Sequence, residues 1–225
     1  MKSIGMLVAV EIGSVLSRYG GEGKREHRGG FDVYNYEMDG CSLHVVNSGV
    51  GELAAAAAAE LLIYAYGVDM VVNFGVVGGL TEEMSRTRTC IVEKIVHYDF
   101  DLSEIDGVPA GQYPGYDDIF IPASPELIEK ALETEPGLKK VICASADKFV
   151  GTEEGKRNLN RLYGADICEM EAAGIALTCN RCGVPFISVK TVADSIDGGG
   201  EAFYEAVAAS SEICLEITEK IIKGL

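Results

Sequence analysis

Short runs of apolar residues alternate with longer helical segments along most of the chain. Continuous apolar runs of this length are typical of strands buried on both faces of a sheet. The last segment has the spacing of a long amphipathic helix. The pattern predicts strands at residues 4–10, 31–38, 42–47, 69–74, 90–96, 140–145 and 185–192, and helices at 51–66, 125–132, 153–162, 170–182 and 202–222.

Turn and loop residues separate several of these predicted elements. Asp39-Gly40 separates two alternating segments, which is a strong signal for a hairpin. Residues 54–59 are six consecutive alanines, which favour a helix with a thin face that packs closely on a sheet. Residues 19–30 and 99–123 are rich in glycine, charge or proline and are predicted to be loops. A loop as long as the second is usually functional.

Strands that alternate with helices define an α/β fold, and the early hairpin favours a mixed sheet over a purely parallel one. The length of 225 residues suits one domain, predicted at 1–225. Ligands of such folds bind beyond the carboxyl ends of strands. The positions to inspect are therefore those that follow Val10, Phe74, Val96, Ser145, Cys168 and Val192.

Charge and cysteine content narrow the class of protein. Lys and Arg number 19 against 35 Asp and Glu, for a net charge of −16, which argues against nucleic acid or an anionic membrane surface as a partner. No apolar run is long enough to span a bilayer, so no membrane span is expected. Seven cysteines without a secretion signal indicate reduced thiols and a cytoplasmic location.

Carboxylates gather at the predicted strand ends. Glu11 follows the first strand, Glu169 and Glu171 follow Cys168, and Asp194 follows the last strand. Each is either a helix cap or a functional group: a carboxylate is a good acceptor for paired sugar hydroxyls, and one in a partly apolar site can act as a general acid. Phe149 is either a core residue or a stacking surface for a ligand.

Glycines at 75, 78 and 79 either form a tight turn or let the backbone approach a ligand closely. They match neither a phosphate-binding P-loop nor the dinucleotide fingerprint, so no cofactor is expected. Cys179-x-x-Cys182 has no partner pair, and His27, His44 and His97 lack the spacing of metal ligands. No metal is expected either.

The order and spacing of several motifs resemble the purine and uridine phosphorylase superfamily, and most of all its 5′-methylthioadenosine/S-adenosylhomocysteine nucleosidases. The resemblance covers nearly the whole chain. It implies a three-layer α/β/α sandwich with a central mixed, twisted sheet. The segments that carry it lie at residues 48–51, 73–80, 99–103, 111–115, 145–149, 169–173 and 192–194.

The resemblance also implies roles for individual residues. Asp194 would protonate the purine N7, and Glu11 is the candidate for the base that activates water. Tyr113 and Pro114 would cover the 5′ group in a neighbouring subunit, which implies a homodimer. The residues implied in substrate binding are Glu171 on the ribose hydroxyls, Met170 on the sugar, Glu169 beside them, Phe149 and the Val150 backbone on the base, and Val76, Val77 and Gly78 in the wall.

The chain departs from the nucleosidase pattern in its first loop. Gly13 stands where those enzymes place the glutamate base, and Val10 stands where they place a methionine. Glu11 replaces the base only if this loop is rearranged. The further departures are Val76 for a serine, Thr87-Arg88 for Gly-Asp and Glu52 for a lysine.

The predicted function is hydrolysis of the N-glycosidic bond of a purine nucleoside such as 5′-methylthioadenosine or S-adenosylhomocysteine, with release of adenine. Asn73 stands where the phosphorylases carry an arginine, which favours water over phosphate. Arg86 and Arg88 are the cations nearest the site by chain position and are expected on the surface. The alternatives are a phosphate-dependent phosphorylase and a catalytically weak nucleoside-binding homologue.

Overall fold

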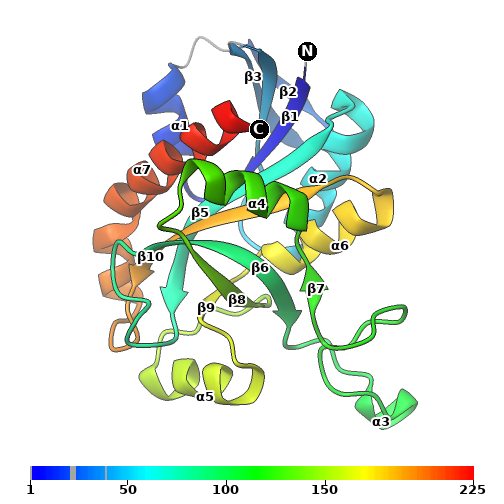
Figure 1. The fold of residues 1–225 in the computed structure, drawn as a ribbon, viewed down its shortest axis with the longest axis vertical. Coiled ribbons are helices and arrows are strands. Elements are labelled where there is room, and N and C mark those ends of the chain that lie inside the picture. Colours follow the sequence, from blue (N-terminus) through cyan, green and yellow to red (C-terminus); the bar gives the residue numbers. More distant parts are fainter. Residues whose placement is uncertain (1, 21–23, 39) are drawn as a thin grey trace.

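The computed structural model describes residues 2–20, 24–38 and 40–225 and shows a sheet covered by helices (Figure 1). The strands are β1 Lys2–Val8, β2 Lys24–Arg28, β3 Phe31–Met38, β4 Cys41–Asn47, β5 Met70–Gly79, β6 Thr89–His97, β7 Ile121–Pro122, β8 Lys139–Ser145, β9 Ile167–Glu169 and β10 Phe186–Asp194. The helices are α1 Ile12–Tyr19, α2 Glu52–Tyr66, α3 Ser103–Asp106, α4 Pro125–Thr134, α5 Glu153–Tyr163, α6 Ala172–Cys182 and α7 Gly200–Gly224.

The sheet is mixed and partly closes on itself. β1 lies between β4 and β5 and is parallel to both, while β2 and β3 extend this side in antiparallel pairing. On the other side β5 pairs with β10, β10 with β6, β6 with β8, β8 with β9, and β9 returns to β5. These pairings form a ring of strands, so the ends of distant strands meet around one opening.

Helices cover both faces of the sheet, so the predicted layered α/β fold with a mixed sheet is confirmed (Figure 1). α2 and α6 pack together on one side, and α1, α4 and α7 lie on the other. The alanines of α2 allow a close approach: Ala55, Ala58 and Ala59 are fully buried, and Gly5 of β1 lies against Leu62. Each helix in the described part of the chain is too short or too polar to cross a membrane.

Most predicted elements are confirmed within a few residues. The hairpin is present as β3 and β4, with Met38 paired to Cys41; Gly40 adopts φ +86°, as a tight turn requires, and Asp39 lies outside the described residues. The helix at 51–66 is α2, and the long segment 99–123 contains only α3 and β7.

Two predictions were wrong. Residues 19–30 are not all loop, because Lys24–Arg28 form the edge strand β2, whose side chains are all exposed and therefore carry no apolar pattern. The strand at 69–74 does not end before the glycines, since β5 continues through Gly79. The short elements α1 and β9 were not predicted, because neither is long enough to show a period.

Candidate active site

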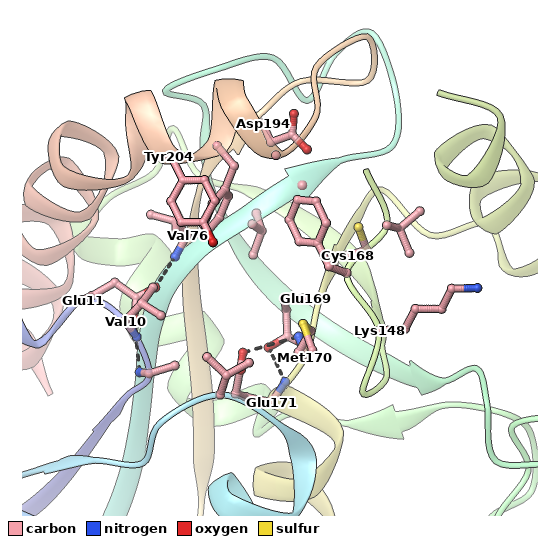
Figure 2. Close-up of a pocket in the computed structure, with 18 residues that line it drawn as sticks. Val10, Glu11, Val76, Lys148, Cys168, Glu169, Met170, Glu171, Asp194 and Tyr204 are labelled. Atoms are coloured by element: carbon pink, nitrogen blue, oxygen red, sulfur yellow. Dashed lines mark hydrogen bonds between the residues drawn. The ribbon is translucent and has the colours of Figure 1, made fainter. Parts of the chain in front are cut away.

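A cavity of about 450 Å³ opens where the ends of β1, β8, β9 and β10 meet the second half of β5 (Figure 2). The start of α7 closes one side with Phe203 and Tyr204. Every residue predicted as catalytic or substrate-binding lies in its wall: Glu11, Val76, Val77, Gly78, Phe149, Val150, Glu169, Met170, Glu171 and Asp194. Residues that follow different strands share this pocket because the ring of strands brings these strand ends together.

Glu11 is buried in this wall, at the residue that precedes α1 (Figure 2). Its Oε1 accepts a hydrogen bond from the Val76 N–H (2.8 Å), and its Oε2 accepts from the N–H groups of Ala9 (3.1 Å) and Val10 (3.0 Å). All three partners are donors. Since a carboxylate has about four acceptor positions, Glu11 retains capacity for one further donor, such as a water.

The neighbouring Gly13 does not share this position. It lies in α1, is exposed, and a Cβ built there meets nothing within 4 Å. The loop places Glu11 in the pocket wall and Gly13 outside it, so the carboxylate of the first loop occupies a different chain position from the one that the resemblance implies.

The glycines of β5 do not form a turn; they leave room for atoms of neighbouring residues that approach the strand closely. A Cβ at Gly75 would lie 2.7 Å from Glu11 Oε1, and one at Gly78 would lie 3.0 Å from Cys168 Sγ. At Gly79 a Cβ would lie 2.0 Å from the Met84 carbonyl oxygen. These residues are glycine because the strand backbone is approached from both sides.

Glu169 and Glu171, at the N-terminus of α6, differ in how many of their acceptor positions are already used. Both oxygens of Glu169 are occupied: Oε2 accepts from the N–H groups of Glu171 and Ala172 and lies 3.3 Å from Lys190 Nζ. Glu171 has weaker partners, the N–H of Gly51 (3.0 Å) and of Met170 (3.3 Å). Glu171 is therefore the carboxyl with acceptor capacity for a ligand, and Glu169 holds the segment in place.

Charge is balanced at this end of the pocket by the buried Lys190 of β10. Burial disfavours its ammonium, but Glu169, Glu171 and Glu11 outweigh burial and raise the pKa of Lys190. Burial and the neighbouring Glu169 raise the pKa of Glu171 to about 8. Hydroxyl donors of a ligand favour the ionised form, so we expect Glu171 to release its proton when a sugar binds.

Behind Glu169, the Ser145 hydroxyl contacts carboxyl groups of both Glu52 and Glu169 and accepts a bond from the Ala173 N–H. One hydroxyl proton cannot serve two carboxylates, so one of the acids is protonated. Glu169 faces Lys190 and two N–H donors, which places the proton on Glu52. Burial, followed by the charge of Glu169, raises the pKa of Glu52 to about 8.

At the opposite side of the pocket lies Asp194 (Figure 2). Its Oδ2 accepts from the ammonium of the fully buried Lys156 at 2.6 Å, whereas its buried Oδ1 has no partner in the structure. Burial raises the pKa of Asp194 although Lys156 opposes the shift. A carboxyl in this state holds a proton more readily than an exposed aspartate does.

The rest of the wall is apolar. Phe149 meets Phe203 edge to face, with ring centroids 5.7 Å apart. Phe149 is 49% exposed, so it is not a core residue, and its ring is free to stack on a ligand. Val10, Val50 and Tyr204, at the pocket mouth, are also at least 49% exposed.

The loop at 111–115 does not reach this pocket. Tyr113 instead stacks on Phe100 (3.8 Å between centroids) and shares a hydrogen bond with His97 Nδ1, while Pro114 is exposed. Arg86 and Arg88 are exposed and outside the pocket wall, as predicted.

The sequence analysis named Arg86 and Arg88 as the cations nearest the site and missed three lysines that the structure places at or beside the pocket. Lys156 and Lys190 are both buried beside the pocket carboxyls, and Lys148 lies at its rim. In the sequence Lys190 interrupts an apolar strand, which is a signal for a paired charge, since lysine is almost never fully buried alone. Lys156 occurs in a polar helix and gives no such signal.

Carboxyl groups at both ends of an apolar-walled pocket, in a mixed α/β sheet, define an enzyme that binds a small molecule with polar ends and transfers protons to or from it. Residues 5–225 match the family model of the Phosphorylase superfamily. The chain belongs to this superfamily.

Relatives in this superfamily narrow the reaction. The chain is 31% identical to the 5′-methylthioadenosine/S-adenosylhomocysteine nucleosidases of Hydrogenovibrio crunogenus, over 76% of this chain and 75% of that protein, and of Staphylococcus aureus, over 76% and 78%. The Helicobacter pylori nucleosidase of the same name has a structure with a TM-score of 0.94 and 28% identity, over 100% of this chain and 99% of that one. A futalosine hydrolase mutant of H. pylori gives a TM-score of 0.94 and 27% identity, over 100% of both chains. These relatives confirm the predicted enzyme class, an N-glycosidic bond hydrolase.

Proposed function

We propose that this protein hydrolyses the N-glycosidic bond of a purine nucleoside such as 5′-methylthioadenosine or S-adenosylhomocysteine and releases adenine. The observation that carries the proposal is the pair of opposed carboxyls, Asp194 at one side of the pocket and Glu171 at the other, with the exposed ring of Phe149 in the same wall. Their placement on opposite sides of one pocket suits a base at the Asp194 side and a sugar at the Glu171 side.

In this mechanism Asp194 donates its proton to the purine N7, and the electron pair of the broken glycosidic bond moves to the base. The sugar develops positive charge, which Glu171 and Glu11 stabilise. A water held by Glu11 forms the new bond to the sugar carbon and gives its proton to Glu11. Solvent then returns a proton to Asp194 and removes one from Glu11.

The pairing of the buried lysines favours water over phosphate as the attacking group. A phosphorylase needs cations that are free to clamp phosphate. Lys190 is surrounded by Glu169, Glu171 and Glu11, and Lys156 donates to Asp194 and to the carbonyl oxygens of Ser195 and Gly198. Lys156 has no donor left for an anion, and the charge of the buried Lys190 is already offset by its carboxyl neighbours.

Futalosine is the second substrate to test, because futalosine hydrolase structures of H. pylori match the fold as well as the nucleosidase does. Val76 and Tyr204 are the residues that we expect to distinguish the two substrates, since both line the pocket and Val76 contacts Glu11.

We further propose a homodimer in which Tyr113 and Pro114 of one subunit cover the pocket mouth of the other. Two observations support it: Tyr113 lies away from its own pocket, and the pocket residue Val50 and the α2 residues Leu53 and Tyr64 are large apolar side chains exposed to solvent. We place the enzyme in the cytoplasm, where its seven free thiols would remain reduced.

The test is release of free base from methylthioadenosine, adenosylhomocysteine, futalosine, adenosine and inosine, each with and without phosphate. We expect adenine from the first two, with no effect of phosphate. Strict dependence on phosphate would indicate a phosphorylase. Thermal stabilisation by a nucleoside without turnover would indicate a binding protein, and no base from any nucleoside would contradict the proposal.

The Asp194→Asn variant tests the general acid. Because an amide cannot donate the required proton, we expect kcat to fall about 10²- to 10⁴-fold. Base release at the wild-type rate would remove Asp194 from the mechanism. Asp117→Asn, at an exposed position outside the pocket wall, is the matched control.

A further inference from the structure

Lys156 is a fully buried lysine that none of the sequence motifs includes. It extends from α5 and uses its ammonium on three acceptors: Asp194 Oδ2 at 2.6 Å, the Ser195 carbonyl oxygen at 2.5 Å and the Gly198 carbonyl oxygen at 3.4 Å. An ammonium has three donors, so this set occupies all of them. The lysine therefore ties the carboxyl of Asp194 to the turn that follows β10.

We propose that Lys156 is a positioning residue that confines the Asp194 proton to Oδ1 and stabilises the carboxylate left when this proton is transferred. The inference rests on the proposed role of Asp194 as the general acid. It adds a residue to the reaction that neither the sequence motifs nor the pocket wall contains.

The hydrogen bonds determine which oxygen carries the proton. Oδ2 faces the ammonium, and a proton on this oxygen would face a donor. Oδ1 is buried and has no partner, and a bare carboxylate oxygen in this position would be unsatisfied. A proton on Oδ1 removes the negative charge from this buried oxygen and leaves an O–H that is available to donate to a bound base. Gly198 provides the space, because a Cβ at this position would lie 2.2 Å from Oδ1.

The charges explain why Lys156 assists the transfer. Before transfer, a buried ammonium faces a neutral acid, which is an unbalanced buried charge. After transfer, the same ammonium faces a carboxylate at 2.6 Å, so the pair is balanced. Proton transfer from Oδ1 to the base thus converts an unpaired buried charge into an ion pair. The glycosidic bond breaks as this proton reaches the base.

Other titratable groups near Asp194 affect its pKa less than burial and Lys156 do. Arg86, in the turn before β6, lowers the pKa of Asp194, and Asp197, in the turn after β10, raises it, both less than burial and Lys156 do. Cys168 of β9 lies near both members of the pair, and burial raises the pKa of its thiol to about 12. Lys156 is the cation in hydrogen-bond contact.

The experiment is a double-mutant cycle of Lys156→Met and Asp194→Asn, with base release measured against pH. We expect Lys156→Met to lower kcat about 10²-fold with less than about a threefold change in KM. Because the lost cation raises the pKa of Asp194, the fall of kcat at alkaline pH should move to higher pH. In the Asp194→Asn background the same change should cost less than about twofold.

An equal loss in both backgrounds, or an alkaline limb that does not move, would mean that Lys156 only stabilises the fold. Wild-type activity of Asp194→Asn would instead refute the proposed function itself, so the two failures are distinguishable. Arg157→Met, which removes an exposed charge from the same helix, is the matched control and should retain wild-type kcat.

If Lys156→Met does not fold, Gly198→Ala tests the same idea with the lysine intact. The new methyl group would displace Oδ1, so kcat should fall by a larger factor than in the glycine control below. Unchanged kcat would contradict the placement of the proton on Oδ1. Gly137→Ala, where a Cβ meets nothing within 4 Å, is the control for the loss of a glycine.

Discussion

Glu11 and Gly13 are two residues apart, but only the first reaches the pocket. The reason is local: Glu11 lies in the turn between β1 and α1, where its carboxylate accepts from the N–H groups of Ala9 and Val10 and also reaches across to Val76 of β5. Gly13 has already turned outward with the helix. A sequence comparison aligns positions, whereas the chemistry depends on which side of the turn a side chain occupies.

Glu11→Gln is expected to lower kcat about 10²- to 10⁴-fold, because an amide is not a base and its NH₂ group would face backbone donors. The same mismatch should lower the free energy of unfolding by about 1–3 kcal/mol. Steady-state kinetics and urea denaturation measure the two effects, with the exposed Glu37→Gln as control. Adding Gly13→Glu should not restore activity, and a rescue would show that residue 13 reaches the pocket.

Glu52→Gln tests the buried proton. The pKa of Glu52 is raised from 4.5 to about 8, so the folded protein keeps a proton that the unfolded chain releases over this interval. The stabilisation is complete below pH 4.5 and is lost as pH rises toward 8, by up to about 1.4 kcal/mol per pH unit. A glutamine is neutral throughout and can keep both the Ser145 and the Gly174 bonds.

The expected result is therefore a smaller loss of unfolding free energy between pH 5 and 8 in Glu52→Gln than in the wild type. Urea denaturation at several pH values measures it. Glu60→Gln, an exposed position on the same helix, should retain the wild-type slope. An unchanged slope in Glu52→Gln would mean that Glu52 is ionised in the folded protein.

At the scale of elements, the turn that precedes β6 holds Thr87 in a strained backbone conformation. The Arg88 N–H donates to the Ser85 carbonyl oxygen, and Thr87 adopts φ +68° at the third position of this turn. A turn with positive φ only at that position favours glycine or asparagine. Thr87 has a β-branched side chain, so it is held in an unfavourable conformation.

Thr87→Gly should raise the free energy of unfolding by about 1 kcal/mol, since the left-handed conformation costs a non-glycine residue about 1–2 kcal/mol and the flexibility of glycine offsets part of the gain. Thermal denaturation measures the change. Ser85→Gly, in the same turn but without positive φ, should destabilise the protein. A lower melting temperature for Thr87→Gly would show that its side chain makes a compensating contact.

At the scale of the whole molecule, the acidic surface and one apolar surface act in opposite directions. The net charge of −16 keeps copies of the chain apart. The apolar surface consists of Val50, Leu53 and Tyr64, and Leu53 is 85% exposed. Large apolar side chains exposed on an acidic protein favour an interface, and Val50 of this set also lines the pocket.

Leu53→Glu should convert a dimer into a monomer, because it adds a negative charge at the centre of this surface to a chain that already repels its copies. Sedimentation velocity measures the mass, and KM for the nucleoside should rise if the partner's loop covers the pocket. Leu162→Glu, at an exposed leucine of α5, is the matched control. A wild-type protein that sediments as a monomer would contradict the proposed dimer.

The sequence by itself determined the elements, the α/β class and the carboxylates at the strand ends. It could do so because hydrophobic periods and strand ends are local properties, and because parallel strands bring their carboxyl ends to one edge. β2 was missed since a fully exposed edge strand has no apolar face, and the end of β5 was missed since its glycines resemble a turn.

Only the tertiary structure decided which groups hold protons. Lys156 is 38 residues from Asp194, and Glu52 is 93 residues from Ser145, so no local pattern predicts either contact. The closed ring of strands buries these groups together, and burial makes each charge depend on its partners. Sequence patterns are therefore enough to name the pocket residues, whereas the fold decides which of them are protonated and which pair with one another.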